Sequence, residues 1–105
     1  MRAAIYARVS SVGYRQDTTR QIRDLEKYAL DNSLVIEKTF EKHISEAKKT
    51  KDRPVLTECL NYCFNNNVDT LLISELSRLG RNVDDVLANV QLCKEHHLNV
   101  YFQKE

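Results

Sequence analysis

Four arginines and one serine stand where they could share a single site. Arg8 and Ser10 come at the end of the first apolar segment, and Arg78 and Arg81 follow the third. Arg78 and Arg81 are about one helical turn apart, so both guanidinium groups can face one ligand. Arg53 ends a lysine-rich stretch just before the second helical pattern. Clustered guanidinium groups suit a phosphate, because each planar fork can donate two parallel hydrogen bonds to its oxygens.

Ser10 adds a nucleophile to this cluster. A serine hydroxyl reacts only when a general base or a stabilising field activates it. No histidine or cysteine occurs near Ser10, so a Ser-His-Asp arrangement is unsupported. The first apolar segment is also not followed by the Gly-x-x-x-x-Gly-Lys-Ser/Thr motif of P-loops. The remaining chemistry is phosphoryl transfer by positioning and charge stabilisation.

Each of these residues also has a purely structural interpretation. Ser10 can cap a turn or a helix. Arg78 and Arg81 can lie on a solvated face, paired with neighbouring carboxylates: Glu75, Asp84 or Asp85. The lysines at positions 48, 49 and 51 are typical of an exposed loop. From the residues alone, the sequence predicts an α/β domain with an anion site and leaves the use of that site open.

The elements that would position this site alternate between two periods. Short apolar segments are typical of strands: 3–9, 34–40, 70–74 and 98–102. Segments with helical spacing lie between them: 18–32, 54–64 and 82–90. We expect Asp17 or Thr18 to cap the first helix, and Asn82, with Asp85 three residues on, to cap the last. This β-α-β-α-β-α-β order predicts an α/β fold, a mainly parallel sheet flanked by helices, with sites at the carboxyl ends of its strands.

Composition bounds the class of protein. The chain has 105 residues, which corresponds to one domain, and 16 basic against 15 acidic residues give a net charge of +1. The net charge therefore neither requires nor excludes a nucleic-acid partner. No apolar run is long enough to span a membrane.

We expect no metal site in this chain. We expect the core to include Tyr6, the three cysteines and the inward face of the last helix: Cys59, Cys63, Cys93, Val83, Val86, Leu87 and Val90.

Three segments together resemble a known family. Residues 6–11 (YARVSS), with Gln21 in the following helix, resemble the amino-terminal signature of the serine site-specific recombinases, which include resolvases, invertases and phage integrases. Residues 52–56 (DRPVL) are similar to the second arginine motif of that family, and residues 75–82 (ELSRLGRN) to the third. The motifs occur in the family's order and spacing, so the resemblance covers essentially the whole chain. It implies the fold of a resolvase catalytic domain.

The resemblance also implies a reaction. Ser10 would attack a DNA phosphodiester to give a 5′-phosphoserine link and a free 3′-hydroxyl, and strand exchange and religation would follow. Arg8, Arg53, Arg78 and Arg81 would bind the scissile phosphate and stabilise its transition state. Supporting positions are implied as well: Gln21, Ser45, Gln16 and Ser77. The family uses neither a metal nor another cofactor for this chemistry.

Two departures from the family pattern concern the supporting residues. Ser77 stands where many members carry an aspartate, next to the first arginine of the third motif. The segment between Ser10 and Gln21 is longer than in the small resolvases and contains Gly13 and Tyr14. The match of Gln16 to a family glutamine depends on how that segment is aligned.

The family further implies partners and missing parts. Double-stranded DNA would be the substrate, bound by a homodimer on paired half-sites and by a tetramer in synapsis, in the cytoplasm of a bacterium or a phage or mobile-element host. We expect residues 1–105 to be a truncated catalytic domain, with a long dimerisation helix and a DNA-binding domain beyond Glu105. The alternative is a non-catalytic domain of the same fold that serves oligomerisation or DNA positioning.

Overall fold

The computed structural model describes residues 1–9, 15–43, 55–80 and 82–104. Within these ranges the chain forms four strands: β1 (Arg2–Val9), β2 (Val35–His43), β3 (Thr70–Glu75) and β4 (Asn99–Lys104). Three α-helices and a short 3-10 helix connect them: α1 (Arg15–Asp31), α2 (Val55–Asn65), η2 (Leu76–Leu79) and α3 (Val83–Glu95). The predicted order of strands and helices is confirmed.

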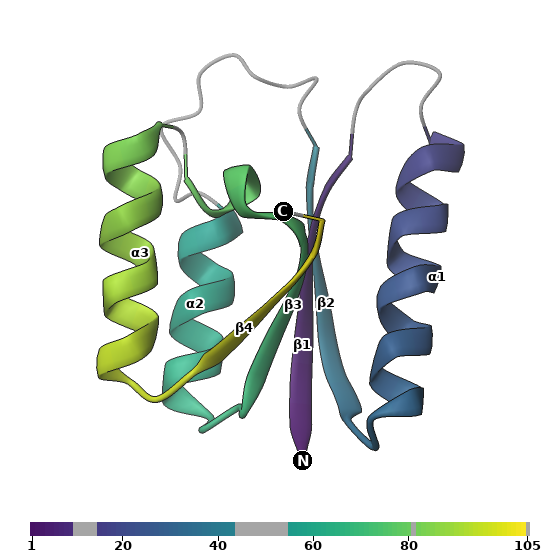
Figure 1. Ribbon diagram of the computed structural model, residues 1–105, viewed down its shortest axis with the longest axis horizontal. Helices are drawn as coiled ribbons and strands as arrows, with labels where there is room; N and C mark the ends of the chain where they lie inside the picture. The colour runs from purple at the N-terminus through teal and green to yellow at the C-terminus, as the bar shows by residue number, and fades with distance from the viewer. Residues whose placement is uncertain (10–14, 44–54, 81, 105) are drawn as a thin grey trace.

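All strands run parallel in the order β2-β1-β3-β4. Helix α1 covers one face of the sheet, and α2 and α3 cover the other (Figure 1). The predicted α/β fold with a parallel sheet is therefore confirmed. From β1 the chain crosses to β2 on one side, and from β2 it returns to β3 on the other side of β1. The carboxyl ends of β1 and β3 consequently form the switch point at which ligands bind in such sheets.

The larger core lies between the sheet and the helices α2 and α3. Tyr6 of β1 is 2% exposed and belongs to it, as expected. The three cysteines are buried free thiols in the same cluster, which confirms their predicted core role. Burial raises the pKa of the Cys93 thiol to about 11, so this sulfur stays protonated and unreactive at neutral pH.

The smaller core lies under α1. Ala3 and Ile5 of β1 and Leu72 of β3 pack there against Leu25 and Ala29 of the helix. Residues of β1 thus alternate between the two cores, since successive strand side chains point to opposite faces. A sheet buried on both faces explains why β1 and β3 are nearly continuous apolar runs.

A β-bulge in β2 adapts that edge strand to both cores. The register pairs Ala3 with Ile36 but Ala4 with Lys38, so Glu37 is the extra residue. Ile36 therefore packs into the α1 core, whereas Phe40 packs into the α2–α3 core. Without the bulge, the period of two would place both side chains on one face.

Several sequence-based details were wrong. Helix α1 begins at Arg15, so Asp17 and Thr18 lie inside it and do not precede it as caps. Strand β2 continues to His43, beyond the predicted end at residue 40. Val83 and Leu87 are 72% and 62% exposed, although both were expected to face inward. The core contacts of α3 follow the single stripe Val86, Val90 and Cys93, and Leu87 lies about 100° around the helix from it.

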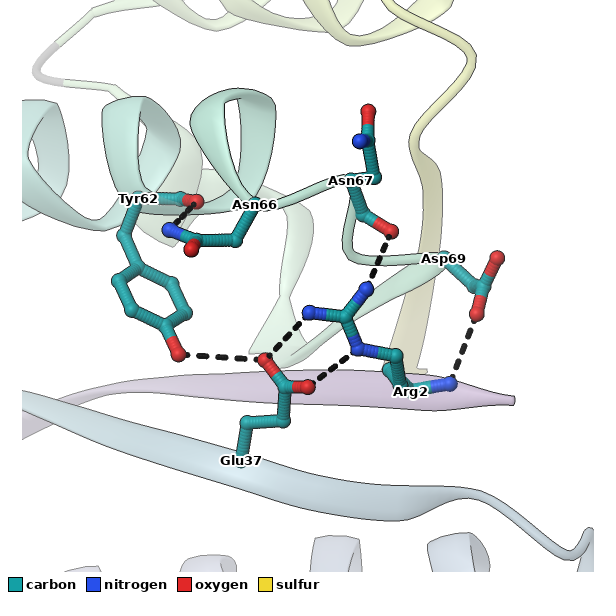
Figure 2. Close-up of polar contacts among 6 residues, drawn as sticks. All are labelled: Arg2, Glu37, Tyr62, Asn66, Asn67 and Asp69. Atoms are coloured by element: carbon teal, nitrogen blue, oxygen red, sulfur yellow. Dashed lines mark hydrogen bonds and ion pairs between the residues drawn. The ribbon is translucent and has the colours of Figure 1, made fainter.

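An ion-pair network holds the amino ends of the strands (Figure 2). The Arg2 guanidinium donates two hydrogen bonds to the Glu37 carboxylate, one from Nε and one from Nη2, the latter at 3.2 Å. The Tyr62 hydroxyl of α2 donates to Glu37 Oε1 at 3.1 Å. The Arg2 backbone N–H donates to Asp69 Oδ2 at 2.7 Å. The network therefore joins β1 to β2, to α2 and to the turn before β3.

The network predicts a pH-dependent stability. The hydrogen bond from Arg2 lowers the pKa of Glu37 below its ordinary value of 4.5. The carboxylate binds a proton more weakly in the folded than in the unfolded chain, so its stabilisation is complete above pH 4.5 and is lost as the pH falls through the folded-state pKa. Urea unfolding should therefore show Glu37→Gln to be less stable than wild type at neutral pH, with a difference that shrinks in acid. Glu26→Gln, an exposed carboxylate on α1, is the matched control. A pH-independent difference would contradict the assignment.

Candidate active site

The predicted site residues cluster, where described, at the carboxyl edge of the sheet. Arg8 is the penultimate residue of β1, and its backbone pairs with Lys42 of β2. Ser77 and Arg78 lie in η2, directly after β3. Since β1 and β3 are neighbours, both chain segments leave the sheet at the same edge. For Arg8, and for Gln16 in the first turn of α1, the structure describes the backbone but not the side chain. Four further predicted site residues lie outside the described residues altogether: Ser10, Ser45, Arg53 and Arg81.

Leu79 anchors the η2 turn to the core. This side chain is fully buried in the α2–α3 core. Asn89 of α3 donates from Nδ2 to the Leu79 carbonyl oxygen at 2.7 Å. Asn82 caps α3 as predicted, accepting at Oδ1 from the Asp85 backbone N–H at 2.8 Å. The Asn89 bond thus ties the turn that carries Arg78 to the middle of α3, and the Asn82 cap fixes the start of that helix.

Arg78 lies half-buried on this turn beside a carboxylate. Its Nη2 is 3.4 Å from Oε2 of Glu75, the last residue of β3. The Ser77 hydroxyl donates to Oε1 of the same carboxylate at 3.3 Å. The pairing of Arg78 with a neighbouring acidic residue, one of the alternatives open from sequence, is therefore observed with Glu75. Arg78 Nε is buried and has no hydrogen-bond partner among the described residues.

The α1 side of the same edge carries two further polar groups. Gln21 is half-buried, one helical turn before the buried Leu25, on the stripe of α1 that faces the sheet. Ser74 of β3 is 3% exposed, and its hydroxyl has no partner among the described residues. Sequence analysis identified Gln21 and named Glu75 as one possible partner of Arg78, but it missed Ser74. The polar ending of an otherwise apolar strand, Ser74-Glu75, is the signal that could have found it.

The described residues contain no group of three or more histidine, cysteine or acidic side chains placed to hold a metal ion. None of the described helices is both long and apolar enough to cross a membrane.

A parallel sheet with this strand order and an arginine-bearing turn at its switch point defines an α/β domain with a candidate phosphate site. Residues 3–105 match the family model described as the resolvase N-terminal domain. The chain therefore belongs to the resolvase family, whose members are serine recombinases. The resemblance noted in the sequence is confirmed.

Individual relatives agree with this assignment. The Transposon Tn2501 resolvase of Escherichia coli is 30% identical over 100 residues, which is 95% of this chain and 48% of that protein. The chain thus spans about half the length of this curated relative.

Solved structures agree in fold. The C-terminal catalytic domain of ISC1926 TnpA, an IS607-like serine recombinase, superposes with a TM-score of 0.81 at 26% identity, covering 100% of this chain and 71% of that one. The N-terminal catalytic domain of TP901-1 integrase gives 0.75 at 28% identity, covering 98% and 77%. The same fold therefore occurs in catalytic domains placed at either end of their proteins.

Gly80 offers a test of how the site turn is held. A Cβ at this position would lie 2.7 Å from both Asp85 Cβ and the Val86 backbone nitrogen. Because a backbone atom is among these contacts, Gly80→Ala should force η2 away from α3 and destabilise the protein by about 1–3 kcal/mol. Urea unfolding measures this loss. Unchanged stability would mean that the close approach of turn and helix is not maintained in solution.

Proposed function

We propose that the protein cuts and rejoins DNA at specific sites, with Ser10 as the nucleophile. The observation that carries this proposal is the parallel pairing of β1 with β3, which brings the carboxyl end of β1, with Arg8, and the Arg78 turn to one edge of the sheet. Membership of the resolvase family supports the same reaction. Ser10 follows the end of β1 by one residue in the sequence, so this pairing supports a site shared by Ser10 and Arg78.

The proposed reaction exchanges one phosphoester bond for another and does not hydrolyse the phosphodiester. The Ser10 hydroxyl loses its proton as its oxygen bonds to phosphorus, and the bond from phosphorus to the 3′ oxygen breaks. The products are a 5′-phosphoserine link and a free 3′-hydroxyl, which takes up a proton. The same steps in reverse, with a new 3′-hydroxyl as nucleophile, rejoin the strands. No external energy source is required, because one phosphoester replaces another.

The arginines supply charge in this proposal. Arg8, Arg53, Arg78 and Arg81 would hold the phosphate oxygens and stabilise the charge that builds up in the transition state. Fixed positive charge near Ser10 would also favour its alkoxide. Supporting roles fall to Gln16, Gln21, Ser45 and Ser77.

The proposed substrate is double-stranded DNA. A homodimer would bind paired half-sites and a tetramer would carry out strand exchange. The proposal includes a dimerisation helix and a DNA-binding domain, and the relative, of which this chain spans about half, is long enough to hold such further parts.

Covalent trapping tests the nucleophile. The protein in its full natural length is incubated with a suicide DNA substrate that carries its attachment site, and the adduct is mapped by mass spectrometry. A phosphonucleotide is expected on Ser10, and Ser10→Ala should form none while still binding DNA. Ser11→Ala, the neighbouring serine, is the matched control and should retain the adduct. An adduct in Ser10→Ala would refute the nucleophile, and bound DNA without adduct in wild type would favour the non-catalytic alternative.

Substitution of Arg78 tests charge stabilisation. Arg78→Ala should slow cleavage by on the order of 10²-fold, comparable with the loss of one transition-state donor. Cleavage is measured as the rate of adduct formation at saturating DNA. Arg23→Ala, an exposed arginine on α1, is the matched control. A change of only a few-fold in Arg78→Ala would make that side chain structural.

A further inference from the structure

The Glu75 carboxylate connects two residues of the candidate site. Its Oε2 is 3.4 Å from Nη2 of Arg78, and its Oε1 accepts from the Ser77 hydroxyl at 3.3 Å. The side chains of Glu75 and Arg78 are 37% and 28% exposed. An ion pair so accessible to water contributes little to folding stability. Its main consequence is therefore the orientation of the guanidinium group.

The guanidinium group of Arg78 has a second donor that Glu75 does not engage. The Nε atom is buried, and its hydrogen has no acceptor among the described residues. A buried N–H without an acceptor is unfavourable, so its partner has to come from outside these residues. The side chain as a whole is 28% exposed, so the outer part of the guanidinium can still bind a phosphate oxygen, an acceptor of the right charge.

We propose that Glu75 is a positioning residue for Arg78: its carboxylate fixes the Nη2 end of the guanidinium and so orients the exposed part of the group before the DNA phosphate binds. The inference rests on the proposed function and adds a residue to it. Ser77 contributes by holding the other carboxylate oxygen, so both oxygens of Glu75 are fixed. An arginine oriented before the substrate arrives loses less rotamer freedom when it binds, and small displacements of a catalytic group are costly in rate.

Glu75→Gln tests the proposal in the full-length protein. The amide keeps the size of the side chain and one oxygen acceptor but removes the charge. We expect adduct formation at saturating DNA to slow by roughly tenfold. The DNA concentration for half-saturation and the melting temperature should stay near their wild-type values, since one phosphate contact is a small part of DNA affinity and the ion pair is exposed. Glu26→Gln is the matched control and should cleave at the wild-type rate.

A double-mutant cycle separates positioning from a general structural effect. If Glu75 acts through Arg78, Glu75→Gln should have no further effect in the Arg78→Ala background. Independent, multiplicative losses would overturn the proposal. So would a wild-type rate in Glu75→Gln. A faster rate would also overturn it, because Glu75 would then compete with the phosphate for Arg78.

The wild-type adduct distinguishes this inference from the proposed function. If wild type forms the Ser10 adduct and Glu75→Gln matches it in rate, only the role of Glu75 fails. If wild type binds its DNA without forming an adduct, the proposed function fails and the role of Glu75 fails with it.

Discussion

The parallel pairing of β1 with β3 is the constraint on which the rest of the structure depends. Residues Ala3–Tyr6 pair with Thr70–Ile73, although a helix, a strand and a second helix separate them in the chain. Strands β2 and β4 flank this pair. Because crossovers between parallel strands are right-handed and the chain reverses direction after β2, α1 lies on the face opposite α2 and α3. The same pairing places the carboxyl ends of β1 and β3 next to each other. The candidate site therefore depends on this strand contact, and the two cores depend on it together with the direction of the crossovers.

The amino ends and the carboxyl ends of the strands differ in how their polar groups are paired. At the amino ends, Arg2, Glu37 and Tyr62 satisfy one another and join the strands to α2. At the carboxyl ends, polar groups remain without partners among the described residues, namely the Ser74 hydroxyl and Arg78 Nε. Buried polar groups are normally paired, so the partners of these two groups lie outside the described residues. The polar groups are therefore mutually paired at the amino ends of the strands, whereas the candidate site lies at the carboxyl ends.

Packing of the turn after β3 restricts the position of the Arg78 side chain. Leu79 is fully buried, and Gly80 allows backbone contact with α3. These two residues fix η2 at both the core and the helix, and Arg78 is held half-buried as a result. Glu75 then limits the freedom of the guanidinium group. An arginine on a mobile surface loop would have to lose that freedom on binding, at the expense of rate.

Sequence by itself determined the order of strands and helices, the cap at Asn82, the core role of Tyr6 and the cysteines, and the family. These features depend on periodicity, capping and motifs, which involve residues close together in the chain. Ser10, Arg8 and the arginines at 53, 78 and 81 were also selected from motifs, and their roles stay predictions. Only the tertiary structure decided the exposure of Val83 and Leu87, the bulge at Glu37 and the contact of Glu75 with Arg78. Local patterns cannot fix such features, because they depend on which neighbour the strand order and register place beside each side chain.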